Sequence, residues 1–246
     1  MNINILCLYP NMTDLYGDNN NIDILRYRAN KRNISVNIDV YTIGDEVPNF
    51  NFYDLVFLGG SSNKEQKIIA NELLKIKKEI KESIREGIFY LLICSGFEVF
   101  GKSFEDNEKN KIKSLGIYDF YSEFDKTKRC IGDIILKSNI NGKEIKILGF
   151  ENHLSSVKNI NRPLGKVIYG NGNSFKDEYE GYFDENVIGT HLHGPLLSKN
   201  PELTDYILTY ILKRKYKKDI NLEKLDDEFE YIAKKEMLDK LLSGKI

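Results

Sequence analysis

The sequence predicts an α/β protein with a mostly parallel sheet and helices on both of its faces. In the first half of the chain, short apolar runs alternate with longer amphipathic segments. Their order is strand, helix, strand, strand, helix, strand, which is typical of a parallel sheet covered by helices. The last of these strands runs into Cys-Ser-Gly, a sequence suited to the sharp strand-to-helix turn called a nucleophile elbow.

Four strands and two helices are expected before residue 100. The strands lie at 3–9, 34–42, 53–60 and 88–93. A first helix is expected at 21–32. A second is expected at 63–87, because isoleucine and leucine recur at steps of three and four from Ile69 to Ile84, and Gly87 provides a stop.

The second half of the chain mixes strands, loops and helices. Strands are expected at 130–137, 144–150 and 187–192, a loop at 170–174, and helices near 202–216 and 222–242. No repeat or flexible linker divides the sequence. We therefore expect one domain over residues 1–216 and a C-terminal helical extension over 217–246.

Composition excludes several classes of partner. Lys and Arg number 36 and Asp and Glu number 37, so the chain has no basic footprint for nucleic acid or an anionic membrane. No apolar run approaches eighteen residues and the N-terminus has no secretory pattern, which predicts no membrane insertion. The three cysteines are odd in number and lack metal-type spacing, and this favours a reducing cytoplasm.

Cys94 is a candidate nucleophile. It follows six apolar residues that predict a strand buried on both faces, and Ser95 and Gly96 permit a tight turn into a helix. At that corner the helix N-terminus favours the thiolate, and its free N–H groups can hold an oxyanion. Free cysteine is also among the most buried residue types, so a core cysteine is the alternative interpretation.

The histidines suggest a base for this thiol. His191 and His193 lie two residues apart on a predicted strand and would share a face, as a metal pair would require. His153 and the cysteines show no ligand spacing that completes such a site, so no metal is expected. One histidine that reaches Cys94 could accept its proton. A structural histidine at a strand end is an equally open interpretation.

Several ordered motifs resemble a known family. The segments "YLLICSGFEVFG" and "GTHLHGPLLSKNPEL" resemble the class I glutamine amidotransferases of the cobyric-acid-synthase type. Within that family, "YPNMTDLYGDNN", "FLGGSSNKEQ", "KRCIGDIIL" and "LGFENH" are similar to segments of the small glutaminase subunits (GatD type) of lipid II isoglutaminyl synthases. The resemblance spans roughly residues 3 to 210.

The resemblance implies roles for individual residues. Cys94 would attack the amide carbon of L-glutamine, His193 would be its base, and Arg129 would bind the substrate, as suits a carboxylate that invites a bidentate guanidinium. The backbone N–H groups of Ser95 and Gly60 would hold the oxyanion. The resemblance implies no cofactor.

One position of the resembling motif departs from many relatives. The residue two places after the catalytic histidine is often a Glu that orients it, and here it is Pro195. We therefore expect a Cys-His dyad whose third partner, if any, comes from elsewhere in the chain.

The resemblance also implies a partner. The glutaminase would supply ammonia to an ATP-dependent, Mur-ligase-like subunit that amidates the D-glutamate of the peptidoglycan precursor lipid II. The sequence has no G-x-x-x-x-G-K-[ST] motif of its own for ATP. Alternatives are a different amide ligase as partner, or a non-catalytic binding subunit. The last is suggested by Ser95 and Glu98, which replace residues usual in the family, since a charged Glu98 would raise the pKa of the Cys94 thiol.

Overall fold

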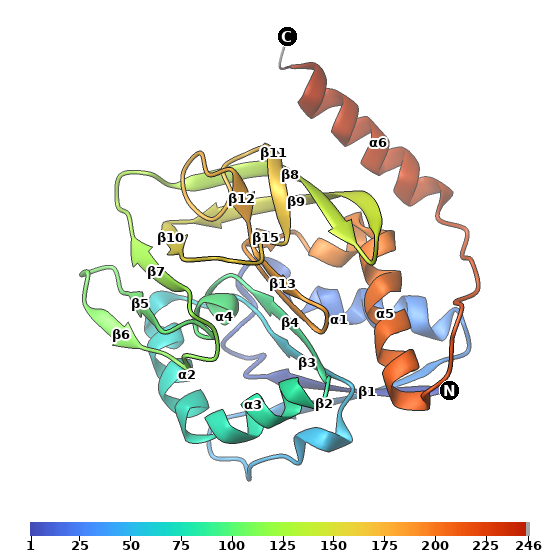
Figure 1. The fold of residues 1–246 in the computed structure, drawn as a ribbon, viewed down its shortest axis with the longest axis horizontal. Helices are drawn as coiled ribbons and strands as arrows, with labels where there is room; N and C mark the ends of the chain where they lie inside the picture. Colours follow the sequence, from blue (N-terminus) through green and yellow to red (C-terminus); the bar gives the residue numbers. More distant parts are fainter. Residues whose placement is uncertain (245–246) are drawn as a thin grey trace.

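A six-stranded sheet forms the centre of the protein, whose computed structural model describes residues 1–244 (Figure 1). Its strand order is β13-β14-β4-β3-β1-β2. The strands are β1 (Asn2–Leu8), β2 (Ser35–Tyr41), β3 (Leu55–Leu58), β4 (Phe89–Ile93), β13 (Tyr182–Asp184) and β14 (Val187–Thr190). All pairings are parallel except that of the edge strand β13. The predicted fold class is confirmed.

Helices cover both faces of this sheet. They are α1 (Asn20–Asn30) and α5 (Pro201–Tyr216) on one face, and α2 (Asn63–Lys75) and α3 (Lys77–Arg85) on the other. Side chains alternate along β1, so Ile5 packs toward α1 and α5 while Leu6 packs toward α2 and α3. Buried strands of this kind need apolar residues at every position, which explains their unbroken hydrophobic runs.

The second predicted helix is two helices. The chain breaks at Ile76, where φ is −115° and ψ is 20°, and the two pieces, α2 and α3, follow each other around the sheet. The periodicity of isoleucine and leucine continues across Ile76, so the sequence pattern did not reveal the break. A capping box at Ser62 and Glu65 begins α2, and Gly87 follows the end of α3 at a φ of 79°, as its sequence position predicted.

A second, antiparallel layer contains the strands predicted at 130–137 and 144–150. They are longer than expected, β8 (Cys130–Ile140) and β9 (Lys143–His153), and form a hairpin closed by Asn141-Gly142. Both turn residues have positive φ, the geometry that Asn-Gly favours. Three strands complete this sheet: β11 (Gly165–Tyr169), β12 (Tyr179–Glu180) and β15 (Leu192–His193).

A four-stranded sheet was not predicted from the sequence. It consists of β5 (Ser103–Glu105), β6 (Lys111–Lys113), β7 (Tyr121–Phe124) and β10 (Ser155–Lys158). These strands have three or four residues, too few for a periodic pattern to be distinct. The loop expected at 170–174 contains no strand or helix.

The last helix, α6 (Glu228–Ser243), begins six residues later than expected. The irregular segment before it returns along α1, where Arg28 binds Asp227 at 2.5 Å and Arg32 donates to the Glu223 carbonyl at 2.7 Å. Figure 1 shows α6 at the outer edge of the molecule, on the side of β8 and β9. The division of the chain at residue 216 stays a prediction.

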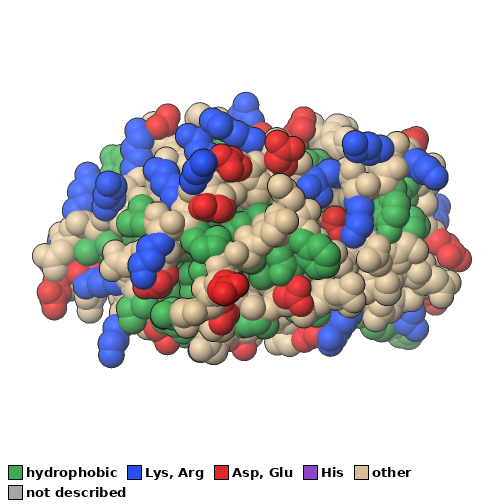
Figure 2. Space-filling view, turned by 90° about the horizontal axis from the view of Figure 1, so that it is seen from below, with side chains coloured by type: hydrophobic (Ala, Val, Ile, Leu, Met, Phe, Trp, Pro, Cys, Tyr) green, Lys and Arg blue, Asp and Glu red, His purple; other side chains and the backbone are tan. Residues whose placement is uncertain are grey.

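Charged side chains of both signs are interspersed on the surface. Figure 2 shows Lys and Arg beside Asp and Glu around an apolar area, with no histidine visible on that face. The three histidines are at most 6% exposed. No helix within residues 1–244 has the length and apolar character needed to cross a membrane.

Candidate active site

Cys94 stands on a sharp corner between β4 and the short helix α4 (Ser95–Glu98). Its φ of 53° and ψ of −118° are rare for a residue with a side chain, and such strain is typical of functional sites. Gly96 allows the corner to press against β3, because a Cβ there would lie 2.5 Å from the Leu58 carbonyl oxygen. The Cys94 N–H donates to the Thr190 carbonyl of β14 at 2.7 Å. The predicted elbow geometry is present.

The carboxyl ends of the parallel strands bring four groups together. Gly60 follows β3, Cys94 follows β4, Asp18 lies in the loop after β1, and His193 lies just beyond β14. A Cβ on Gly60 would be 3.0 Å from Asp18 Oδ2, 3.2 Å from Cys94 Cβ and 3.3 Å from His193 Cε1. Only a glycine leaves this space open between the thiol and the imidazole. Ligands of open α/β sheets bind at this edge.

Asp18 fixes the orientation of His193. His193 Nδ1 lies 2.8 Å from Asp18 Oδ1, and both side chains are buried. A carboxylate accepts, so Nδ1 carries the proton and donates it to Asp18, which leaves Nε2 with a free lone pair. Nε2 is buried and has no hydrogen-bond partner in the described chain. Its unused lone pair suits a base that waits for a proton.

Asp18 was not identified from the sequence. It lies in "YGDNN", between the 3-10 turn η1 (Leu15–Gly17) and α1, and in the sequence this stretch is an ordinary polar loop. Its contact with His193 makes it a candidate for the third partner expected from elsewhere in the chain. Tyr16 of the same loop places its ring edge-on to His193, with centroids 4.8 Å apart. The loop therefore both orients and covers the imidazole.

The two backbone groups expected in an oxyanion hole lie beside Cys94. The Gly60 N–H donates to Asp18 Oδ2 at 3.0 Å, so its use by an oxyanion requires this bond to be exchanged. The Oγ of Ser95 accepts a hydrogen bond from the Ser61 N–H at 2.7 Å. This hydrogen bond links the Cys94 corner to the loop after β3.

Burial raises the pKa of the Cys94 thiol well above its usual range. The charges of Glu98 and Asp18 raise it further, whereas a hydrogen bond from the Ser95 backbone opposes them. The expectation that Glu98 disfavours the thiolate is confirmed in direction, although burial is the larger cause. Cys94 is therefore held as a thiol in this state, and it would need a base close by to act as a nucleophile.

Glu98 belongs to a buried polar cluster. Its Oε1 lies 3.2 Å from His191 Nε2, and its Oε2 accepts hydrogen bonds from Gln66 and Ser122. Burial alone would raise the pKa of Glu98, but the hydrogen bond and charge of His191 lower it below its usual range. Glu98 is accordingly an anion that is paired rather than free.

The two histidines of "THLH" have different partners. His193 contacts Asp18, whereas His191 contacts Glu98 and stacks on His153 with ring centroids 4.0 Å apart. The paired-metal interpretation fails on this geometry, since the two rings serve separate networks. Within residues 1–244, no group of three His, Cys, Asp or Glu side chains could hold a metal ion.

Arg129 immediately precedes β8 and is exposed. Its Nε and Nη2 both donate to Asn152 Oδ1, at 2.9 and 2.6 Å. Asn152 is on β9. It comes directly after Phe150 and Glu151, which pair with β15, the strand that contains His193. Arg129 thus lies just before β8, and β9 separates β8 from β15 in the antiparallel sheet. Its hydrogen bonds in the described chain do not reach Cys94 or His193.

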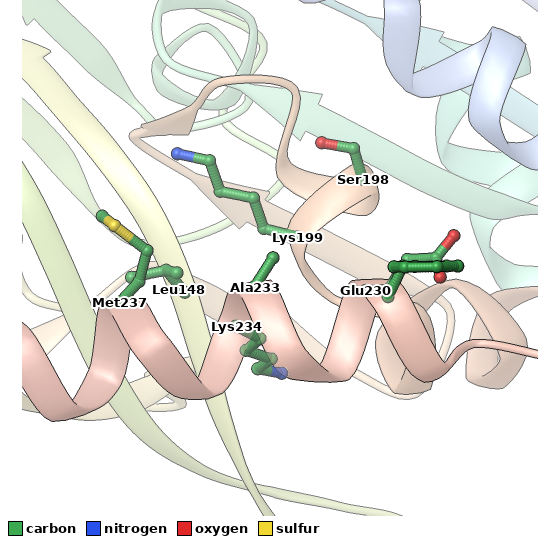
Figure 3. A pocket seen from close by; sticks show the side chains of 8 residues that line it. Leu148, Ser198, Lys199, Glu230, Ala233, Lys234 and Met237 are labelled. Atoms are coloured by element: carbon green, nitrogen blue, oxygen red, sulfur yellow. The ribbon is translucent and has the colours of Figure 1, made fainter.

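A separate hollow lies under α6. Its volume is about 430 Å³, and Figure 3 shows Ala233 and Met237 of α6 on the side facing Lys199. The lining is mostly apolar, and it contains none of the four residues Asp18, Gly60, Cys94 and His193. Phe229 at its rim is 83% exposed. This hollow is distinct from the site at the sheet edge.

Comparisons with known proteins identify relatives over most of the chain. The family model described as a CobB/CobQ-like glutamine amidotransferase domain matches residues 4–201. The protein named lipid II isoglutaminyl synthase (glutamine-hydrolyzing) subunit GatD from Staphylococcus aureus (strain N315) is 41% identical over 240 residues, 96% of each chain. The protein of the same name from Streptococcus pneumoniae (strain ATCC BAA-255 / R6) is 37% identical over 92% of this chain and 86% of that one.

A more distant relative and a solved structure complete the comparison. A probable cobyric acid synthase of Methanocaldococcus jannaschii is 29% identical over 72% of this chain but only 37% of its own length. A crystal structure of a glutamine amidotransferase has the same fold, with a TM-score of 0.52 at 14% identity, covering 84% of this chain and 98% of that one. The resemblance inferred from the sequence motifs is confirmed.

Proposed function

The chain belongs to the CobB/CobQ-like glutamine amidotransferase family, and from this premise we propose that it is the glutaminase subunit of a lipid II isoglutaminyl synthase. It hydrolyses L-glutamine and passes the ammonia to a Mur-ligase-like subunit that amidates the D-glutamate of lipid II. The observation that carries the proposal is a strained Cys94 beside a His193 oriented by Asp18. The names of the Staphylococcus aureus and Streptococcus pneumoniae relatives supply the acceptor.

The mechanism begins at the thiol. Cys94 Sγ attacks the side-chain carbonyl carbon of glutamine while its proton moves to His193 Nε2, whose other nitrogen is held by Asp18. This transfer overcomes the raised pKa of Cys94, because the proton has an acceptor at the moment of attack. The C–N bond then breaks, and the proton passes from His193 to the leaving amine as ammonia departs.

Water completes the cycle. His193 removes a proton from a water molecule, which attacks the glutamyl thioester on Cys94. The C–S bond breaks, glutamate leaves, and the sulfur regains its proton from the imidazolium. Asp18 stabilises the imidazolium twice in each turnover, once in acylation and once in deacylation.

Backbone N–H groups stabilise the oxyanion of both tetrahedral intermediates. The Ser95 N–H stands directly after the nucleophile, and the Gly60 N–H exchanges its bond to Asp18 for the oxyanion. One such donor typically lowers the barrier by about 3 kcal/mol. Arg129 binds the α-carboxylate of glutamine through its planar guanidinium, for which Asn152 holds the side chain in place.

The partner subunit supplies what this sequence lacks. The chain has no phosphate-binding motif for ATP, so activation of the acceptor carboxyl takes place on another polypeptide. Its three cysteines are free rather than paired, which suits the reducing cytoplasm where we place the reaction.

Reconstitution with the ligase subunit tests the proposal. The two chains should co-purify and convert lipid II to its amidated form with either glutamine or ammonium chloride as nitrogen source. With Cys94→Ala, amidation should be lost with glutamine and kept with ammonium. Amidation that Cys94→Ala leaves intact with glutamine would favour a non-catalytic subunit, and glutamate release without lipid II amidation would favour a different ligase.

A further inference from the structure

A charged histidine lies behind the nucleophile and is used by no step of the mechanism. His191 is fully buried, and its Nε2 faces Glu98 Oε1 at 3.2 Å. Its Nδ1 lies 3.5 Å from Oε1 of Glu180 on β12, a carboxylate that is also fully buried. The imidazole therefore stands between two carboxylates from different elements.

The remaining neighbours of His191 are neutral. His153 of β9 stacks on it, and burial lowers the pKa of His153 well below its usual range. Phe97 of α4 packs edge-on from the elbow helix, with centroids 5.6 Å apart. Burial would also lower the pKa of His191, but its pairing with the carboxylates of Glu180 and Glu98 raises it to about 9. At neutral pH, His191 is the single cation of this cluster.

The charges of the cluster act on Cys94. Glu98 and Glu180 both raise the pKa of the Cys94 thiol, and Glu98 is the stronger because it lies one turn along the elbow helix. A cation between them must act in the opposite direction. The position of the Glu98 side chain also depends on His191, since Oε1 lies 3.2 Å from His191 Nε2.

We infer that His191 is a positioning residue, which holds Glu98 in place and cancels its charge so that Cys94 can react. The inference rests on the proposed function, because it takes Cys94 as the nucleophile. It also explains why Glu98 is tolerated on the elbow helix, because the positive charge of His191 compensates its buried carboxylate. Without His191, Cys94 would lie beside two uncompensated carboxylates.

Three variants test the inference by charge. His191→Gln removes the cation, Glu98→Gln removes one anion, and the double variant removes both. The measurement is the pH dependence of Cys94 alkylation by iodoacetamide, which needs no turnover. We expect the alkylation rate at pH 7 to fall about tenfold in His191→Gln, to rise in Glu98→Gln, and to return near the wild-type value in the double variant.

Two controls separate charge from structure. His153→Gln removes a stacked imidazole from the same cluster but no charge, so its alkylation profile should match the wild type. The wild-type and His191→Gln profiles should also converge above about pH 9, where His191 loses its own proton. Thermal unfolding of each variant reports its folding. If His191→Gln does not fold, Glu98→Gln alone decides, by the direction of its shift.

Turnover of the complex with the ligase subunit gives the second measurement. Glutamate release at pH 7 should fall about tenfold in His191→Gln and recover in the double variant. A double variant no better than His191→Gln, or an unshifted Glu98→Gln profile, would overturn the inference. A wild-type complex that releases no glutamate would overturn the proposed function instead, whatever the order of the alkylation profiles.

Discussion

Replacing Asp18 with Asn should disable His193 without removing it. The carboxylate accepts from His193 Nδ1 at 2.8 Å and from the Gly60 N–H at 3.0 Å. An amide offers one oxygen for these two donors, and its NH₂ group favours the tautomer in which Nε2 carries the proton. In that tautomer Nε2 cannot accept the Cys94 proton.

The magnitude follows from the bonds that are lost. A hydrogen bond to a charged group contributes about 1.5–3 kcal/mol, and Asp18 also stabilises the imidazolium that forms during attack. A total of about 4 kcal/mol corresponds to roughly a 1,000-fold lower kcat. KM for glutamine should change little, because neither bond is to the substrate.

Glutamate release by the complex with the ligase subunit is the assay for Asp18→Asn. Asp14→Asn is the matched control, since Asp14 is in the same loop but exposed, and its Oδ1 accepts only from the Asn19 N–H in the described chain, at 2.9 Å. Its kcat should be within about twofold of wild type. An Asp18→Asn variant with near-wild-type kcat, or equal losses in both variants, would refute the orienting role of Asp18.

Three further changes test the remaining groups. Cys94→Ala should abolish glutamate release while the complex still forms. A glutamine-like electrophile should label Cys94 rather than Cys7 or Cys130, because Cys94 stands beside His193 at the sheet edge whereas the other two are core thiols; labelling at either would contradict the assignment. Arg129→Lys keeps the charge but loses the planar fork, so KM for glutamine should rise about tenfold; an unchanged KM would place the α-carboxylate elsewhere. Gly60→Ala puts a methyl group 3.2 Å from Cys94 Cβ, so kcat should fall at least tenfold while the melting temperature stays within a few degrees, and equal kcat would show that the site can widen.

The fold could be predicted where one sequence segment decides one element. The buried strands β1, β3 and β4 are short apolar runs, and such runs are typical of strands that are covered on both faces of a parallel sheet. Membership of a sheet depends on partners far away in the chain, so β8 and β9 were recognised as strands but not as a separate antiparallel layer. The Asn141-Gly142 turn between them was the local signal that could have identified the hairpin.

The break at Ile76 shows a different limit. The apolar stripe of α2 and α3 runs on without interruption because both helices pack on the same face of the sheet. Periodicity reports which side is buried, and a change of helix direction within that side leaves it unaltered. The delayed start of α6 has a related cause, since the preceding segment is held in an irregular path by Arg28 and Asp227.

The candidate site divides in the same way. Cys94 could be found from the sequence because an elbow needs an apolar strand before it and small residues after it, all within a few positions. Asp18 has no such signal, since its role arises only when parallel pairing of β1, β3 and β4 brings their carboxyl ends to one edge. The loop after β1 thus supplies the carboxylate that contacts His193. A proline at position 195, two residues after His193, is compatible with this arrangement, because Asp18 in the loop after β1 orients the imidazole.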